Sequence, residues 1–179
     1  MAEAFINQVN RAVGIVTSSS NASIGVGLTW MSGISTAHVA INDLVDNSNF
    51  IAGTKVTFVG VSSVQLDRAS TNTVAATASN VSFLGPTTSY TSASATKSIL
   101  IGGTFANNTA NSVNLTVTVY DNSTATESQL AAKIPVPTGS SFVISDAGKT
   151  VLEGDDEVRV YCDTENAIDV NLSILKGVS

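Results

Sequence analysis

The sequence predicts an all-β protein, and three observations support this prediction. Among the 179 residues, 22 Val and 21 Thr carry β-branched side chains, which suit pleated strands and disfavour helices. The 24 Ser and 15 Asn favour turns, because their side chains bond the nearby backbone. Val113, Leu115, Val117 and Val119 recur at period two, as in a strand with one buried face.

Residues 1–21 have no periodicity that settles their structure. A short helix from Ala2 to Val13 would be broken by the polar run at 17–21. We expect this segment to be an N-terminal arm that becomes ordered on assembly. The alternative is that it forms a first strand of the core.

Residues 22–83 are predicted to form a small β module. Short alternating stretches such as Val64-Gln65-Leu66 lie between turn signals such as Asn42-Asp43 and Asp46-Asn47. Residues 84–97 are low in charge and include Gly85-Pro86, so we expect a linker there.

Residues 98–179 are predicted to form an antiparallel β-sandwich, with either immunoglobulin-like or jelly-roll topology. The turn at 107–111 leads into the alternating run at 113–119, and Pro135 stops a following strand at the edge of a sheet. Further alternating stretches at 158–162 and 168–174 complete the set.

Composition and charge argue against several function classes. The net charge is −6 and charged residues make up 12% of the chain, about half of the usual share of roughly 25%. Nucleic-acid binding needs clustered positive charge, and an anionic membrane attracts it too, so neither partner is expected. No run of about 18 apolar residues is present to span a bilayer. The N-terminal residues lack a signal-peptide pattern, which favours synthesis in a reducing cytoplasm.

The chain offers few residues for catalysis. His38 is the single histidine and Cys162 the single cysteine, so a nucleophile–histidine system would depend on these two. Cys162 continues the apolar face of Val158 and Val160, which indicates a buried small hydrophobic residue. A zinc site needs several His or Cys ligands, so we expect no metal and no cofactor.

Two acidic stretches, 153–157 and 163–166, contain the oxygen ligands that calcium prefers. Neither has the ligand spacing of an EF-hand loop, and both fall where strands must turn, so we interpret them as turns.

A glycosidase would need paired carboxylates, which 14 acidic residues supply without specificity. The Trp and Tyr residues, which could stack on a sugar, are scattered along the chain at Trp30, Tyr90, Tyr120 and Tyr161. We interpret Trp30-Met31 as part of the core or of an interface. We therefore expect no catalytic, cofactor-binding or metal-binding residues.

Two stretches resemble parts of phage proteins. Residues 133–144 (KIPVPTGSSFVI), 149–160 (KTVLEGDDEVRV) and 167–175 (AIDVNLSIL) resemble a C-terminal domain of virion structural proteins of tailed bacteriophages, cyanophages in particular. The motifs SGIST, NDLV, AGTKV and VQL, between residues 32 and 66, look like a short β-module of phage particle and fibre proteins.

The resemblance implies a non-enzymatic accessory subunit of the virion that docks on the head, neck or tail. Other virion proteins and further copies of the chain, in closed symmetry such as a trimer or a ring, are the expected partners. An alternative is a fibre or adhesin module that binds a host surface glycan or protein, which predicts an exposed aromatic or acidic cluster on loops. A third, a wall or polysaccharide hydrolase, would depend on the acidic residues of 153–157.

Overall fold

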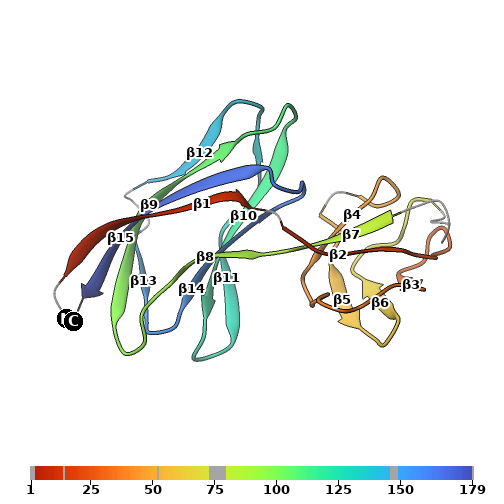
Figure 1. Ribbon diagram of the computed structural model, residues 1–179, viewed down its shortest axis with the longest axis horizontal. Helices are drawn as coiled ribbons and strands as arrows, with labels where there is room; N and C mark the ends of the chain where they lie inside the picture. Colours follow the sequence, from red (N-terminus) through yellow and green to blue (C-terminus); the bar gives the residue numbers. More distant parts are fainter. Residues whose placement is uncertain (1–2, 14, 52, 73–79, 146–148, 179) are drawn as a thin grey trace. The chain divides into compact units, whose positions relative to one another are not determined.

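The computed structural model describes residues 3–13, 15–51, 53–72, 80–145 and 149–178. The chain divides into two compact units, each described here by itself. The sandwich unit comprises residues 1–13, 86–162 and 166–179, and the inserted unit comprises residues 14–85 and 163–165. Figure 1 shows their strands. The described residues contain no helix that could span a membrane.

The sandwich unit consists of two antiparallel sheets, which confirms the predicted all-β class. One sheet has the order β1-β15-β9-β12, with β13 also paired to β9, and the other has the order β11-β10-β14-β8. The strands are β1 (Ala4–Val13), β8 (Thr87–Thr91), β9 (Lys97–Asn107), β10 (Val113–Asp121), β11 (Thr126–Val136), β12 (Ser141–Ile144), β13 (Thr150–Leu152), β14 (Glu157–Cys162) and β15 (Ile168–Val178).

The strand order identifies the sandwich as a jelly roll rather than an immunoglobulin-like fold. Because β12 and β13 pair with successive parts of β9, they fill one position in the sheet, and the unit has eight strand positions. The first pairs with the last (β1–β15), the second with the seventh (β8–β14), the third with the sixth and the fourth with the fifth (β10–β11). Such nested pairing, folded over into two sheets, is the jelly-roll pattern of two Greek keys.

The core of the sandwich comes from the alternating faces of its strands. The predicted inward face of β10 is confirmed, because Val113, Leu115, Val117 and Val119 are all buried. They pack with residues such as Phe105 on the opposite sheet. The edge position predicted from Pro135 is confirmed, since β11 lies at the edge of its sheet, but the strand continues through Pro135 and ends at Val136.

The segment expected as an N-terminal arm is instead part of both units. Residues 4–13 form β1, which pairs with β15 from Ala4↔Lys176 to Val13↔Ile168. Residues 15–21 form β2 of the inserted unit. The alternative, a first strand of the core, is therefore the correct one for β1.

The expected linker at 84–97 is also a strand. Gly85 ends β7, and Thr87–Thr91 forms β8, the edge strand that pairs with β14. Two of its side chains bond to neighbouring strands, because Tyr90 Oη lies 2.9 Å from Ser98 Oγ and the Thr88 hydroxyl donates to Glu157 Oε2 at 3.0 Å. The sandwich thus begins at β1, and residues 14–85 are inserted between its first and second strand positions.

The inserted unit contains two three-stranded antiparallel sheets, with the orders β2-β7-β4 and β3-β6-β5. The strands are β2 (Ile15–Asn21), β3 (Trp30–Ser32), β4 (Leu44–Asp46), β5 (Val56–Val59), β6 (Ser63–Leu66) and β7 (Asn80–Gly85). Met31, Val56, Val64 and Phe83 are completely buried in its core. The expected module at 22–83 therefore gains β2 and the end of β7, together with residues 163–165.

Candidate functional site

The acidic stretch 153–157 serves the turn that leads into β14. Asp156 is buried, and its Oδ1 accepts a hydrogen bond from the backbone N–H of Asn122 at 3.1 Å. Its Oδ2 accepts one from the backbone N–H of Glu153 at 2.9 Å. Asp155 adopts a left-handed conformation at φ 69°, as tight turns often require.

The glutamates of this stretch form ion pairs. Glu153 Oε1 lies 2.9 Å from Lys97 Nζ, and Glu157 Oε2 lies 2.7 Å from Arg159 Nε. Glu157 Oε2 also accepts a hydrogen bond from the hydroxyl of Thr88 at 3.0 Å. Among the residues that the structure describes, no three His, Cys, Asp or Glu side chains gather where they could hold a metal ion.

His38 and Cys162 lie in different units. His38 is exposed, with a left-handed backbone at φ 69°. Cys162 is completely buried in the sandwich core, and its Sγ contacts the backbone oxygen of Val13 at 3.9 Å. The interpretation of Cys162 as a buried hydrophobic residue is confirmed, and a buried thiol of this kind is chemically inert.

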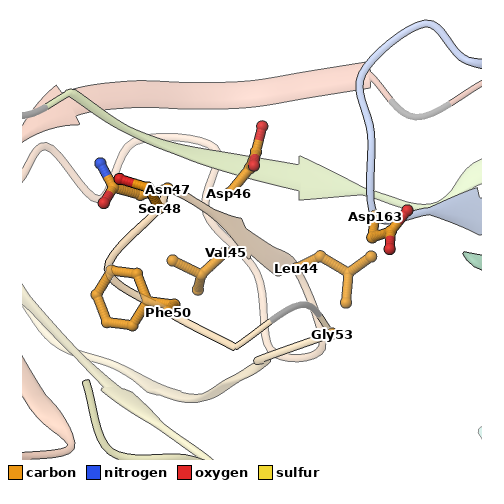
Figure 2. A pocket seen from close by; sticks show the side chains of 8 residues that line it. All are labelled: Leu44, Val45, Asp46, Asn47, Ser48, Phe50, Gly53 and Asp163. Carbon is orange, nitrogen blue, oxygen red and sulfur yellow. The ribbon is translucent and has the colours of Figure 1, made fainter. Parts of the chain in front are cut away.

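Two carboxylates border a hollow of about 330 Å³ in the inserted unit. Figure 2 shows Asp46 at the end of β4 and Asp163 on a separate segment, with Val45 and Phe50 along the wall. Partial burial, together with the negative charges of Asp163 and Glu165, raises the pKa of Asp46. The hollow is therefore an acidic environment that disfavours anionic ligands.

Asn47, the polar residue next to Asp46, makes hydrogen bonds within the inserted unit. The side-chain amide of Asn47 donates to the backbone oxygen of Asn80 at 2.7 Å. Its Oδ1 accepts from the backbone N–H of Asn49 at 2.9 Å and from the Asn49 amide at 2.8 Å. These bonds hold the loop after β4, so Asn47 shapes the wall of the hollow.

Each tyrosine of the sandwich unit is buried or contacts another side chain of that unit. Tyr161 is buried, Tyr90 shares a hydrogen bond with Ser98, and Tyr120 lies beneath the guanidinium of Arg159 at 3.8 Å from its ring centroid. Tyr90 and Tyr120 are half-buried. They do not form the exposed aromatic cluster that a fibre or adhesin module predicts.

Trp30 differs from the tyrosines, because it is 50% exposed. The interpretation of Trp30-Met31 as core or interface is confirmed for Met31, which is buried, whereas Trp30 faces outward from β3. Phe58 on β5 is 48% exposed, and its ring centroid lies 5.7 Å from that of Trp30, with the rings tilted by 59°.

Trp30, Gln65 and Phe58 form an aromatic row across the sheet β3-β6-β5. Trp30 and Phe58 both pair with Gln65 on the central strand, so the three side chains lie on one face. The two rings offer apolar surface and the amide offers one acceptor and two donors. The sequence alone did not single out Phe58 or Gln65, although the alternation of 64–66 predicts that Gln65 faces outward.

Comparisons with known proteins show no family. No protein-family model matches the chain, and no curated protein matches it. Among solved structures, the chain is similar to an Arthrobacter globiformis T6 isomalto-dextranase complexed with panose, at 12% sequence identity and a TM-score of 0.25. The alignment covers 97% of this chain and 34% of the dextranase chain, so the chain spans about a third of the length of that structure.

Proposed function

We propose that this protein is a non-enzymatic, homo-oligomeric accessory subunit of a tailed-phage particle, docked on the head, neck or tail. The observation that carries the proposal is the jelly-roll strand order, with its nested pairs from β1–β15 to β10–β11. Viral capsid proteins use this architecture repeatedly, although lectins and cupins use it too. The resemblance of residues 133–144, 149–160 and 167–175 to virion proteins favours the viral use.

The placement of the acidic residues supports a structural role. Asp156 accepts two backbone hydrogen bonds, and Glu153 and Glu157 pair with Lys97 and Arg159. Buried Asp156 therefore stabilises the sandwich, and the two glutamates are paired with cations of the same unit. The low charged fraction, 12% of residues, also suits a subunit, because docking it desolvates few ions.

Mass spectrometry of purified virions tests the proposal. We expect the chain in particles banded in a density gradient, at a constant ratio to the major capsid protein across the band. A protein that merely adheres to particles would change its ratio between fractions or be removed by a high-salt wash. Banded particles without copies of the chain would refute the proposal.

A second candidate function is a module that binds a host surface glycan, and the exposed aromatic row favours it. An exposed ring can stack on the C–H face of a sugar while the amide of Gln65 bonds its hydroxyl groups. The row lies on strands rather than on the loops where the sequence suggested such a cluster.

A polysaccharide array tests this candidate. We expect binding by the wild-type chain and a loss of about 30-fold or more in the Trp30→Ala and Phe58→Ala variants, the size typical of interface hot spots. Val61→Ala is the matched control, because Val61 is an exposed apolar residue of the same unit. An array without binding, or equal binding by all variants, would reject the candidate.

A further inference from the structure

The sheet β1-β15-β9 with β12 and β13 has an outer face that is rich in apolar side chains. The strand register places Phe5, Leu175, Ile99 and Val151 in one row across four strand positions. Since Ile6 and Ile174, the next residues on two of these strands, point into the core, this row points away from it. The sheet therefore has apolar residues on both sides.

A second row crosses the same face and contains Val9, Asn171, Thr104 and Val143. Between the two rows lie Asn7, Ser173 and Gly102. Phe5 is 77% exposed, and Val9, Val143 and Val151 are also exposed. These four are most of the large exposed hydrophobic residues in the described part of the sandwich unit, where Leu130 is the other. Exposed apolar residues that gather on one face of a sheet in this way indicate an interaction surface.

The two rows and the residues between them carry no charged side chain. Charged residues flank the rows, with Arg11 and Asp169 toward one end, Lys97 and its ion-pair partner Glu153 toward the other, and Lys149 two residues before Val151. Two partners could cover the centre without burying an unpaired ion, which is the costly step in forming an interface. Each copy carries a net charge of −6, so an uncharged face is where two copies repel each other least.

The face also contains a knob beside a hollow. A hollow of about 340 Å³ is bordered by Phe5, Asn7, Ile101 and Ser173. Gly102 contributes no side chain at this point in the sheet, because a Cβ there would approach the backbone oxygen of Ile144 to 2.8 Å. The exposed ring of Phe5 thus stands next to a space that can receive an apolar group. A two-fold axis through the face would place each Phe5 against the hollow of the other copy.

The size of the face is sufficient for a dimer. β15 has 11 residues and is therefore about 36 Å long at about 3.3 Å per residue. Four strand positions about 4.8 Å apart give a width of about 19 Å. Taken over its whole length, with the charged ends included, the face measures about 700 Å², so two copies that meet along all of it would bury about 1,400 Å², within the range of about 1,200–2,000 Å² for specific interfaces.

We propose that this outer face is the surface through which two copies of the chain associate about a two-fold axis. Phe5 of each copy packs into the hollow bordered by Ile101 and Ser173 of the other, and the two sheets meet face to face at about 10 Å. The face gives the homo-oligomer of the proposed function a defined surface. Because the test uses the isolated chain, a monomer would refute this face and leave particle membership, which is tested on virions, unaffected.

Sedimentation velocity of the full chain tests the interface. We expect the wild-type chain to sediment as a dimer at about 100 µM. This concentration lies above the micromolar dissociation constants of the weaker interfaces of this area. Phe5→Asp and Val151→Asp place a charge at opposite sides of the face and should each raise the dissociation constant at least about tenfold. Both residues are exposed, so circular dichroism of the variants should match that of the wild type.

The matched control is Leu130→Asp, which places the same charge on an exposed apolar residue of β11, in the other sheet. This variant should remain a dimer. A wild-type chain that is monomeric throughout the concentration range, or larger than a dimer, would overturn the proposal. Folded Phe5→Asp and Val151→Asp variants that dimerise as well as the wild type would overturn it equally.

Discussion

Asp156 Oδ1 accepts a hydrogen bond from the backbone N–H of Asn122 at 3.1 Å, across 34 positions of sequence. The bond ties the turn that precedes β14 to the turn that follows β10. Because the other carboxylate oxygen accepts the Glu153 N–H, one buried side chain holds both the turn between β10 and β11 and the connection from β13 to β14. An acidic stretch that might suggest a ligand site is thus part of the framework of the sandwich.

Replacement of Asp156 by Ala should therefore destabilise the sandwich unit. Two backbone donors lose a charged acceptor, and we expect the free energy of unfolding to fall by about 2–4 kcal/mol. Urea unfolding monitored by far-ultraviolet circular dichroism measures the change. Asp155→Asn is the matched control, since Asp155 is exposed and Asn tolerates its left-handed conformation. Equal stability of the two variants would show that the buried bonds contribute little.

Asn107 has the same type of role at the end of β9. Its amide donates to the backbone oxygens of Asn111 at 2.7 Å and Val136 at 2.9 Å, and its Oδ1 accepts from the N–H and hydroxyl of Thr109. Asn107→Ala should cost about 2–4 kcal/mol in unfolding free energy. Asn108→Ala, which removes only a weak exposed contact to Asp169 at 3.4 Å, should stay within about 0.5 kcal/mol.

An Asn107→Asp variant gives a sharper test of this network. At neutral pH the introduced carboxylate would face the carbonyl oxygens of Asn111 and Val136, where the native amide donates. We expect a larger loss of stability than in Asn107→Ala, and acidification should recover part of it because a protonated carboxyl can donate one bond. Unfolding curves at pH 7 and pH 4 measure this difference. Stability that does not depend on pH beyond the wild-type change would contradict the assigned bonds.

The sequence predicts some strands well and others poorly, for physical reasons. β10 could be predicted because Val113 to Val119 alternate with polar residues and lie between two turns. β1 could not, because its outward Phe5 and Val9 and its inward Gln8 and Asn10 make neither face uniformly apolar. Its partner β15 also lies at the other end of the chain, so no local signal reveals the pairing.

The misplaced linker has a related cause. β8 is an edge strand made of Thr, Ser and Tyr residues, and its Thr88 and Tyr90 bond to Glu157 and Ser98, so no alternating apolar pattern marks it in the sequence. The aromatic row was equally hidden, since Trp30, Phe58 and Gln65 come together only through the register of three strands. Composition and period thus predict the fold class, whereas strand order and surface clusters depend on pairings between distant segments.

The two units have separate cores, which predicts that core variants act on one unit at a time. Phe83 is completely buried in the inserted unit and Phe105 in the sandwich. Each Phe→Ala variant should lower the unfolding free energy of its own unit by about 3–5 kcal/mol. Trp30 is the single tryptophan and lies in the inserted unit, whereas all three tyrosines lie in the sandwich.

Spectroscopy can therefore follow each unit separately. Tryptophan fluorescence should report the loss in Phe83→Ala, and the tyrosine near-ultraviolet signal should report the loss in Phe105→Ala. Each variant is the control for the other. One common transition that shifts equally in both variants would contradict independent cores.

The raised pKa of Asp46 predicts that this carboxylate destabilises the inserted unit at neutral pH. Its folded-state pKa lies above the ordinary value of 3.8 because of partial burial and the charges of Asp163 and Glu165. Between 3.8 and the raised pKa, the folded state binds more protons than the unfolded state, so stability falls as the pH rises through this window. Asp46→Asn should raise stability above the window, by less than about 1 kcal/mol since the side chain reaches solvent. The gain should disappear below pH 3.8.

Urea unfolding followed by Trp30 fluorescence measures the gain in stability, and Asp163→Asn should recover part of the same gain by removing one repulsive charge. A variant whose advantage over the wild type does not change with pH would contradict the electrostatic explanation.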